Sequence, residues 1–135
     1  MATETPGRTV EPAIRTIEEA RRALPLLRAI ADDAHTTYVR LRARLRRLRG
    51  ALPLERVHDD AGLPDEVRTD LRDLNDQMRE LAELGARVVD PELGILYVDA
   101  TVDGHPAHLC WKLGEDDIRY FVPLDGGYED RRPLP

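Results

Sequence analysis

The chain has 135 residues, a single cysteine, few aromatic residues and no long hydrophobic run. One cysteine cannot form an internal disulfide, which excludes a disulfide-stapled scaffold and favours a reducing compartment. Neither a CxxC pair nor an HExxH motif occurs, so the common zinc motifs are excluded. No apolar segment approaches the roughly 20 residues needed to cross a bilayer, and the polar N-terminus lacks a signal segment. We therefore expect a cytoplasmic protein without a membrane partner.

Charge is unevenly distributed along the chain, whose net charge is −6. Residues 26–49 carry seven arginines against two aspartates, whereas residues 86–135 carry ten acidic residues against five basic ones. No aromatic residue lies among the six arginines of residues 40–49 to stack on bases, so nucleic acid is not expected as a partner. We expect acidic residues of the following helix to neutralise these arginines. The acidic residues are Glu66, Asp70, Asp73 and Asp76.

Two segments with coiled-coil spacing predict a long antiparallel helical hairpin. Thr16 and Glu19 form a capping box at a helix start, and Pro25 should kink that helix or make it restart. Pro64 suits the first position of a second helix, and Gly85 suits its end. Apolar residues in both helices are spaced by alternate steps of 4 and 3. The two seams are Leu27, Ala31, Ala34, Tyr38, Leu41, Leu45, Leu48 and Leu52, and Val67, Leu71, Leu74, Met78 and Leu81.

The residues after Gly85 predict a small antiparallel β-meander. They are rich in β-branched residues, which strands prefer, and Asp103-Gly104 is a strong two-residue hairpin turn. We therefore expect one α+β domain, in which a long coiled-coil-like hairpin packs on this meander. The expected strands are residues 87–89, 95–102, 107–113 and 118–124. The expected layout is a disordered tail over 1–14, a single domain over 15–135, the hairpin over 15–85, the meander over 86–124 and an irregular tail over 125–135.

The Asp103-Gly104 turn also sets which side chains share a face of the sheet. One face is apolar and should pack on the helices, so Trp111 is expected to be mostly buried. The other face should point to solvent, which is normal for an antiparallel sheet. The apolar face pairs Leu96 with Trp111, Val98 with Leu109 and Ala100 with Ala107. The polar face pairs Tyr97 with Cys110, Asp99 with His108 and Ile95 with Lys112.

The polar face carries the first group of candidate site residues. His108 and Cys110 point to one side of their strand, with Tyr97 and Asp99 across from them. Imidazole, thiolate and carboxylate are zinc ligands, and a cysteine beside a histidine can act as a nucleophile. The same residues could simply be half-exposed side chains on the solvent face of the sheet. A lone cysteine commonly behaves as a small hydrophobic residue and has no catalytic or metal-binding role. We expect this simpler explanation, with no metal and no cofactor.

The second group of candidates lies in the turn after the second hairpin strand and in the C-terminal tail. Glu115 occupies a tight turn, where functional side chains often lie, although we favour the simpler explanation of a solvated acidic turn. The tail either folds back so that Arg131 pairs with Glu115 near Cys110, or it is frayed and solvated, as chain ends often are. The candidate catalytic residues are therefore Cys110, Glu115 and Arg131, and the candidate ligand-binding residues are Tyr97, Asp99, His108 and Tyr128.

Three sequence runs together resemble one protein family. They are Thr16 to Ala20 followed by Leu24 to Arg28, then Leu109-Cys110-Trp111-Lys112-Leu113-Gly114-Glu115, and finally Asp125 to Tyr128 followed by Arg131, Pro133 and Leu134. In order and spacing these runs are similar to the bacterial and archaeal domain of unknown function DUF2203, over residues 15–135. The resemblance implies an independent single-domain protein and brings no established activity. Members often carry an aromatic-His pair where this chain has Phe121-Val122, a departure that weakens a metal site.

Two classes of function remain from the sequence. The first is a binding or interaction module that uses the helical hairpin or the open sheet face, with an unidentified protein or small molecule as partner and a possible homodimer through the hairpin. The second is a small enzyme or metal-binding protein with a site around Cys110, Glu115 and Arg131. We favour the first, because no recognised catalytic constellation is present.

Overall fold

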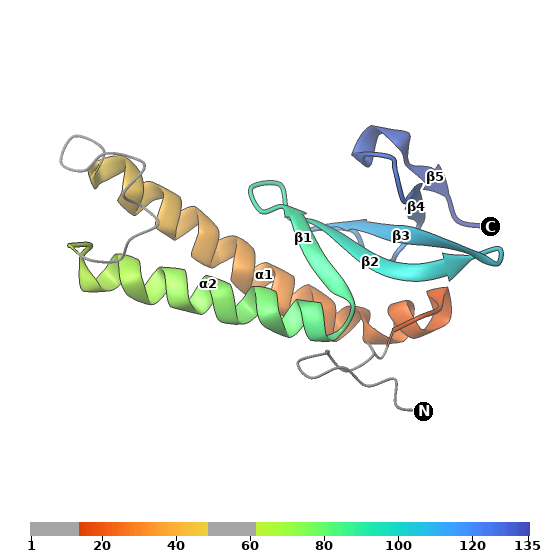
Figure 1. Ribbon diagram of the computed structural model, residues 1–135, viewed down its shortest axis with the longest axis horizontal. Coiled ribbons are helices and arrows are strands. Elements are labelled where there is room, and N and C mark those ends of the chain that lie inside the picture. Colours follow the sequence, from red (N-terminus) through yellow and green to blue (C-terminus); the bar gives the residue numbers. More distant parts are fainter. Residues whose placement is uncertain (1–13, 49–61) are drawn as a thin grey trace, which may run out of the picture.

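The computed structural model describes residues 14–48 and 62–135, which form an α+β fold with a long helical hairpin beside an antiparallel sheet (Figure 1). The sheet lies over the N-terminal half of the longer helix, and the far ends of both helices extend beyond it. Neither helix in the described ranges has an apolar stretch long enough to cross a bilayer. The helices are α1 (Ile17–Leu48) and α2 (Asp65–Glu83). The strands are β1 (Ala86–Asp90), β2 (Ile95–Val102), β3 (His105–Lys112), β4 (Tyr120–Pro123) and β5 (Arg132–Pro133).

Helix α1 begins at the predicted capping box. The Thr16 hydroxyl accepts a hydrogen bond from the Glu19 amide at 3.1 Å, and the Glu19 carboxylate accepts one from the Thr16 amide at 3.1 Å. Of the two outcomes expected at Pro25, a kink or a restart, the restart is wrong, because α1 continues through this residue as one helix. The flanking Leu24 and Leu27 are buried in the core, and this burial offsets the roughly 3 kcal/mol that an interior proline costs.

The hairpin packs along the predicted seams. Helix α2 begins at Asp65 with Pro64 just outside it, and Gly85 follows its end with a φ of 87°. Side chains other than hydrogen are strained at a positive φ of this size, so the position favours glycine. The buried seam residues include Leu27, Ala31, Ala34, Leu41, Val67 and Leu81. Leu52, which was assigned to the first seam, lies outside the described residues.

The sheet has the strand order β1-β2-β3-β4-β5 with every neighbouring pair antiparallel. Asp103 and Gly104 have φ angles of 52° and 79°, as a two-residue hairpin turn requires. All six predicted pairs between β2 and β3 are confirmed. The C-terminal strand differs from expectation, since β4 is shorter than the predicted 118–124 and β5 adds a further strand in the tail.

The main core lies between the helices and one face of the sheet. Trp111 is 0% exposed and contributes to this core together with Leu96, Val98 and Leu109, as the register predicted. Ile14, which was assigned to a disordered tail, is 3% exposed in the same core. The segment is held there because the Thr101 amide donates to the Arg15 carbonyl at 3.0 Å. Residues 1–13 lie outside the described part of the chain.

Candidate functional site

The face of the sheet opposite the helices is covered by the C-terminal segment (Figure 1). Tyr97 and Cys110 on this face form a small second core with Val122, against which Tyr120 and Tyr128 pack. Tyr97 is 6%, Cys110 2% and His108 9% exposed. The prediction of a solvent-facing sheet surface is therefore wrong for these three residues. Tyr120 of β4 and Tyr128 of the tail pack against Tyr97 and Cys110, and the Tyr97 ring stacks on His108.

The tail itself is more regular than expected. A short 3-10 helix, η2 (Tyr128–Asp130), precedes β5, which pairs with β4. The Gly127 amide donates to the Asp130 carboxylate at 2.8 Å, and the Leu134 amide donates to the Arg119 carbonyl at 2.9 Å. The tail folds back onto the sheet, and outside η2 and the short β5 its residues are irregular.

Asp99 and His108 form a hydrogen-bonded pair at the edge of this second core. Because a carboxylate only accepts hydrogen bonds, His108 Nδ1 donates to Asp99 Oδ1 over 2.7 Å. The Tyr97 ring stacks on the imidazole with centroids 5.2 Å apart, and Arg87 lies 3.6 Å from the same carboxylate. An aspartate that holds Nδ1 orients the imidazole and leaves Nε2 for other partners. The structure therefore brings three of the predicted ligand-binding residues together, with His108 in contact with both Asp99 and Tyr97.

Cys110 lies beneath the tail and is not set up as a nucleophile. Burial raises the pKa of its thiol to about 11, an effect that Arg131 opposes and Glu115 reinforces. The reactive form of cysteine is the thiolate, so a thiol with this pKa remains protonated and unreactive at neutral pH. Together with its 2% exposure, this makes Cys110 a packing residue of the second core.

The Cys110 thiol should titrate with a midpoint near pH 11 in the folded protein. The folded pKa exceeds the usual 9.0, so stability should fall as the pH rises from about 9 towards 11, where only the unfolded thiol ionises. Absorbance of the thiolate in the folded chain measures the midpoint, and denaturant melts across this range measure the stability. The Cys110→Ala variant should lack this part of the alkaline decline. A midpoint below pH 9 would instead support a reactive cysteine.

Glu115 stabilises the turn that ends β3. Its carboxylate accepts a hydrogen bond from the Lys112 amide at 2.8 Å, and its main-chain carbonyl accepts one from Trp111 Nε1 at 2.9 Å. The Glu115 amide donates in turn to the Lys112 carbonyl at 3.0 Å. These contacts give Glu115 a structural role, and they satisfy the only polar group of the buried Trp111 ring.

Arg131 contacts Tyr128 of the tail and Tyr120 of β4 instead of Glu115, so the predicted ion pair is wrong. Its Nη1 donates to the Tyr128 hydroxyl at 2.9 Å and its Nε donates to the Tyr128 carbonyl at 3.0 Å. The guanidinium also lies over the Tyr128 ring, 3.9 Å from its centroid, and over the Tyr120 ring at 5.2 Å. The backbone of η2 places Tyr128 and Arg131 on the same turn, which is why this local contact forms.

The described residues contain no group of three or more His, Cys, Asp or Glu side chains arranged to hold a metal ion. The acidic residues after Glu115 have other partners: Asp116 pairs with Arg119 at 2.9 Å, and Asp117 accepts from the Ile118 amide at 2.7 Å. His108 and Asp99 bond to each other, and Cys110 is covered by the tail. The predicted candidates thus have partners within the fold.

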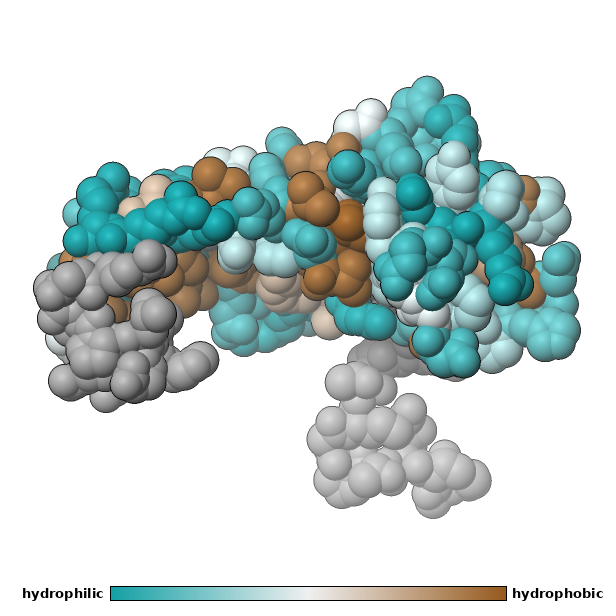
Figure 2. All heavy atoms as spheres, turned by 90° about the horizontal axis from the view of Figure 1, so that it is seen from above, coloured by the Kyte–Doolittle hydropathy of each residue, from teal (hydrophilic) through white to brown (hydrophobic). Residues whose placement is uncertain are grey.

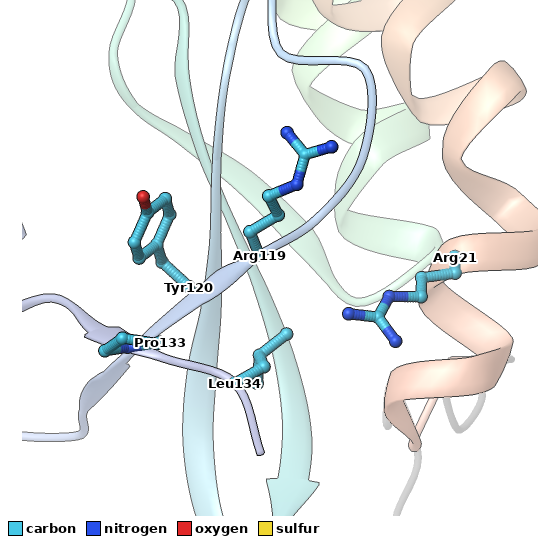
Figure 3. Close-up of a pocket in the computed structure, with 5 residues that line it drawn as sticks. All are labelled: Arg21, Arg119, Tyr120, Pro133 and Leu134. Carbon is cyan, nitrogen blue, oxygen red and sulfur yellow. The ribbon is translucent and has the colours of Figure 1, made fainter.

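A separate pocket lies where α1 meets the C-terminal strands. Its volume is about 310 Å³, and its lining is Arg21, Arg119, Tyr120, Pro133 and Leu134 (Figure 3). Arg21 reaches from α1 toward Leu134, and its Nη2 and Nε donate to the Ile118 carbonyl at 2.9 and 3.3 Å. Sequence reasoning missed this pocket because Arg21 is about a hundred positions from its neighbours. The only signal was that Pro133 and Leu134 belong to the third family-like run.

Comparison with known proteins places the chain in a family. No curated protein and no solved structure matches it. The model of the family described as uncharacterized conserved protein (DUF2203) matches residues 14–134, which is nearly the whole chain and agrees with the resemblance of its three sequence runs. The chain therefore belongs to the DUF2203 family of uncharacterised conserved proteins.

Proposed function

We propose that the protein is an interaction module whose protruding helical hairpin pairs with the hairpin of a second copy. The observation that carries this proposal is the packing of the arm, defined here as residues 40–48 of α1 together with residues 62–76, which include the first part of α2. The arm has a hydrophobic cluster of its own, separate from the main core. Leu41, Leu63 and Val67 are buried in it, whereas Leu45, Leu48, Leu71 and Leu74 are only partly buried.

Two helices alone leave part of a leucine seam open, and a four-helix bundle is the usual way to close it. The main core closes the proximal half of the hairpin with the sheet, and the described residues provide no such layer over the distal half (Figure 1). Figure 2 shows apolar surface on the arm and between the arm and the sheet, surrounded by hydrophilic residues. A second hairpin supplies a matching apolar stripe.

The charges of the two helices are complementary. Residues 40–48 of α1 carry five arginines and no acid, whereas α2 carries seven acidic residues against three arginines. Asp70 neutralises two of these arginines within the chain, since it lies 3.0 Å from Arg40 and 2.5 Å from Arg44. Arg46 and Arg47 are exposed and form no ion pair with any described residue. A two-fold arrangement of hairpins would place α1 of one copy along α2 of the other, which pairs opposite charges.

The enzyme alternative has less support. It requires Cys110, Glu115 and Arg131 to act on a substrate, but each of these side chains already packs against or bonds to another residue of the fold. Cys110 is buried with a pKa raised to about 11, and Glu115 caps the turn after β3. The Asp99–His108 pair has the geometry of an oriented base, but Cys110 on the same face is buried, and its raised pKa keeps the thiol protonated at neutral pH.

The test is the solution mass of the full chain by light scattering or sedimentation. We expect a species of twice the 15.3 kDa chain mass, which dissociates on dilution between about 500 and 5 µM. The double variant Arg46→Glu/Arg47→Glu should weaken the dimer by about tenfold or more, because it places acidic side chains against acidic α2. The matched control is Arg22→Glu/Arg28→Glu, which makes the same change of charge on α1 outside the arm and should leave the dimer intact.

Circular dichroism of both double variants checks that the helices remain folded. A monomer at every concentration would overturn the proposal and would indicate that the open seam is closed within one chain. A dimer that responds equally to both double variants would place the interface away from the arm.

A further inference from the structure

The pocket between α1 and the C-terminal strands combines two guanidinium groups with an apolar wall. Arg21 and Arg119 supply the charge, and Pro133, Leu134 and Tyr120 complete the lining. The Arg21 guanidinium points toward Leu134, whereas the Arg119 guanidinium points away from it (Figure 3). At about 310 Å³ the pocket has the size of the smaller ligand sites of proteins. None of its lining residues belongs to the arm, so the pocket is independent of the proposed dimer.

The Arg21 side chain is held in place for binding. Two of its N–H groups donate to the Ile118 carbonyl at 2.9 and 3.3 Å, which fixes the plane of the guanidinium beside the pocket. A guanidinium has five N–H donors, so this contact leaves donors for a ligand. Orientation by the backbone lowers the entropic cost of binding, because a flexible side chain does not have to be ordered.

The apolar wall is also fixed. Leu134 is anchored by its amide, which donates to the Arg119 carbonyl at 2.9 Å, and Pro133 pairs with Tyr120 across β4 and β5. The Arg131 guanidinium lies 5.2 Å from the centroid of the Tyr120 ring. The tail therefore forms one side of the pocket through contacts that include the family-like residues Arg131, Pro133 and Leu134.

The neighbouring acids define the charge that the pocket accepts. Asp117 lies 3.6 Å from Arg21 and Asp116 lies 2.9 Å from Arg119, although neither aspartate lines the pocket. Two adjacent carboxylates oppose a dianion such as phosphate more strongly than a singly charged group. Planar carboxylates also match the guanidinium fork, with which they form paired hydrogen bonds.

We propose that this pocket binds a small monocarboxylate with an apolar or aromatic body. The carboxylate would lie at Arg21, with Arg119 adding positive charge to the same pocket, and the body would lie against Pro133 and Leu134. The two guanidiniums come from segments far apart in the sequence, so the site exists only in the folded chain. Ligand binding at this position would also fasten the C-terminal segment to α1.

Benzoate is the probe, with benzamide as its neutral isostere and inorganic phosphate as an anion without an apolar body. Benzoate is titrated into the full chain up to about 50 mM and followed by amide NMR. For a ligand of this size, the chemical-shift changes should saturate at millimolar benzoate. The shifts should centre on residues 118–121 and 132–134. Benzamide and phosphate should each bind at least about fivefold more weakly than benzoate, because each lacks one of the two required features.

Substitution of the pocket arginines separates specific from nonspecific binding. Arg119→Gln should weaken benzoate about tenfold, whereas the matched change Arg22→Gln, at an exposed arginine outside the pocket, should alter it less than about twofold. Arg21→Gln should act like Arg119→Gln, with a thermal melt to check that β4 stays in place. Equal binding of benzoate and benzamide, an unchanged affinity of Arg119→Gln, or shifts confined to other residues would each overturn the proposal.

Discussion

Replacement of Trp111 by alanine should lower the free energy of unfolding by about 3–5 kcal/mol. The side chain is 0% exposed and is the largest fully buried one in the described part of the chain. Alanine would leave a cavity in the core between the sheet and the helices, and it would also leave the Glu115 carbonyl without the donor that now lies 2.9 Å away. Since domains of this size have a total stability of about 5–15 kcal/mol, this loss would bring the protein close to unfolding.

Denaturant melts of the full chain measure this effect. Trp111→Phe keeps an aromatic ring but removes the Nε1 donor, so its loss should be smaller than that of the alanine variant. Leu124→Ala is the exposed control, because Leu124 is 56% exposed, and it should change stability by less than about 0.5 kcal/mol. A loss below about 1 kcal/mol for Trp111→Ala would contradict the role of this residue in the core.

The second large effect should come from removal of the arginines that neutralise Asp70. This carboxylate is 2% exposed, between Arg40 at 3.0 Å and Arg44 at 2.5 Å. The double variant Arg40→Ala/Arg44→Ala would leave a buried charge without a partner, and we expect a loss of about 3 kcal/mol. The partners come from opposite helices, so the loss should appear first as opening of the arm, visible as faster amide exchange over residues 40–48 and 65–74.

The triple variant Arg40→Ala/Arg44→Ala/Asp70→Ala is the matched control for this prediction. It removes the buried charge together with its partners, so it should recover part of the stability that the double variant loses. If the triple variant recovered no stability relative to the double variant, the unpaired charge of Asp70 would not be the cause of the loss.

These arginines also show how far ion pairs between the two helices could be predicted from the sequence. The expectation that acidic residues of α2 neutralise the α1 arginines is confirmed at Asp70 and at Glu66, which lies 3.4 Å from Arg44. Asp76 instead pairs with Arg79 on its own helix at 3.2 Å. Helical spacing predicts which residues lie on a common face, but it does not predict which partner a long side chain will choose.

In the candidate site, the sequence predicted the strand register but not the burial of the side chains. The register of β2 and β3 placed Tyr97, Asp99, His108 and Cys110 on one face, and the structure confirms their pairing. The burial of Tyr97, His108 and Cys110 could not be inferred from these two strands, because Tyr120 and Tyr128, which pack over this face, come later in the chain. The missed contact between Arg131 and Tyr128 has a local cause, the turn of η2, which composition alone did not indicate.

The sequence by itself determined the secondary structure and much of the pairing. The capping box at Thr16, the leucine seams and the Asp103-Gly104 turn act over a few residues, and local geometry allows few alternatives to them. Tertiary structure decided which faces are buried, whether α1 continues through Pro25, and where Arg21 meets the C-terminal strands. Those outcomes depend on contacts between distant segments, in which the free energy of burial outweighs local preference.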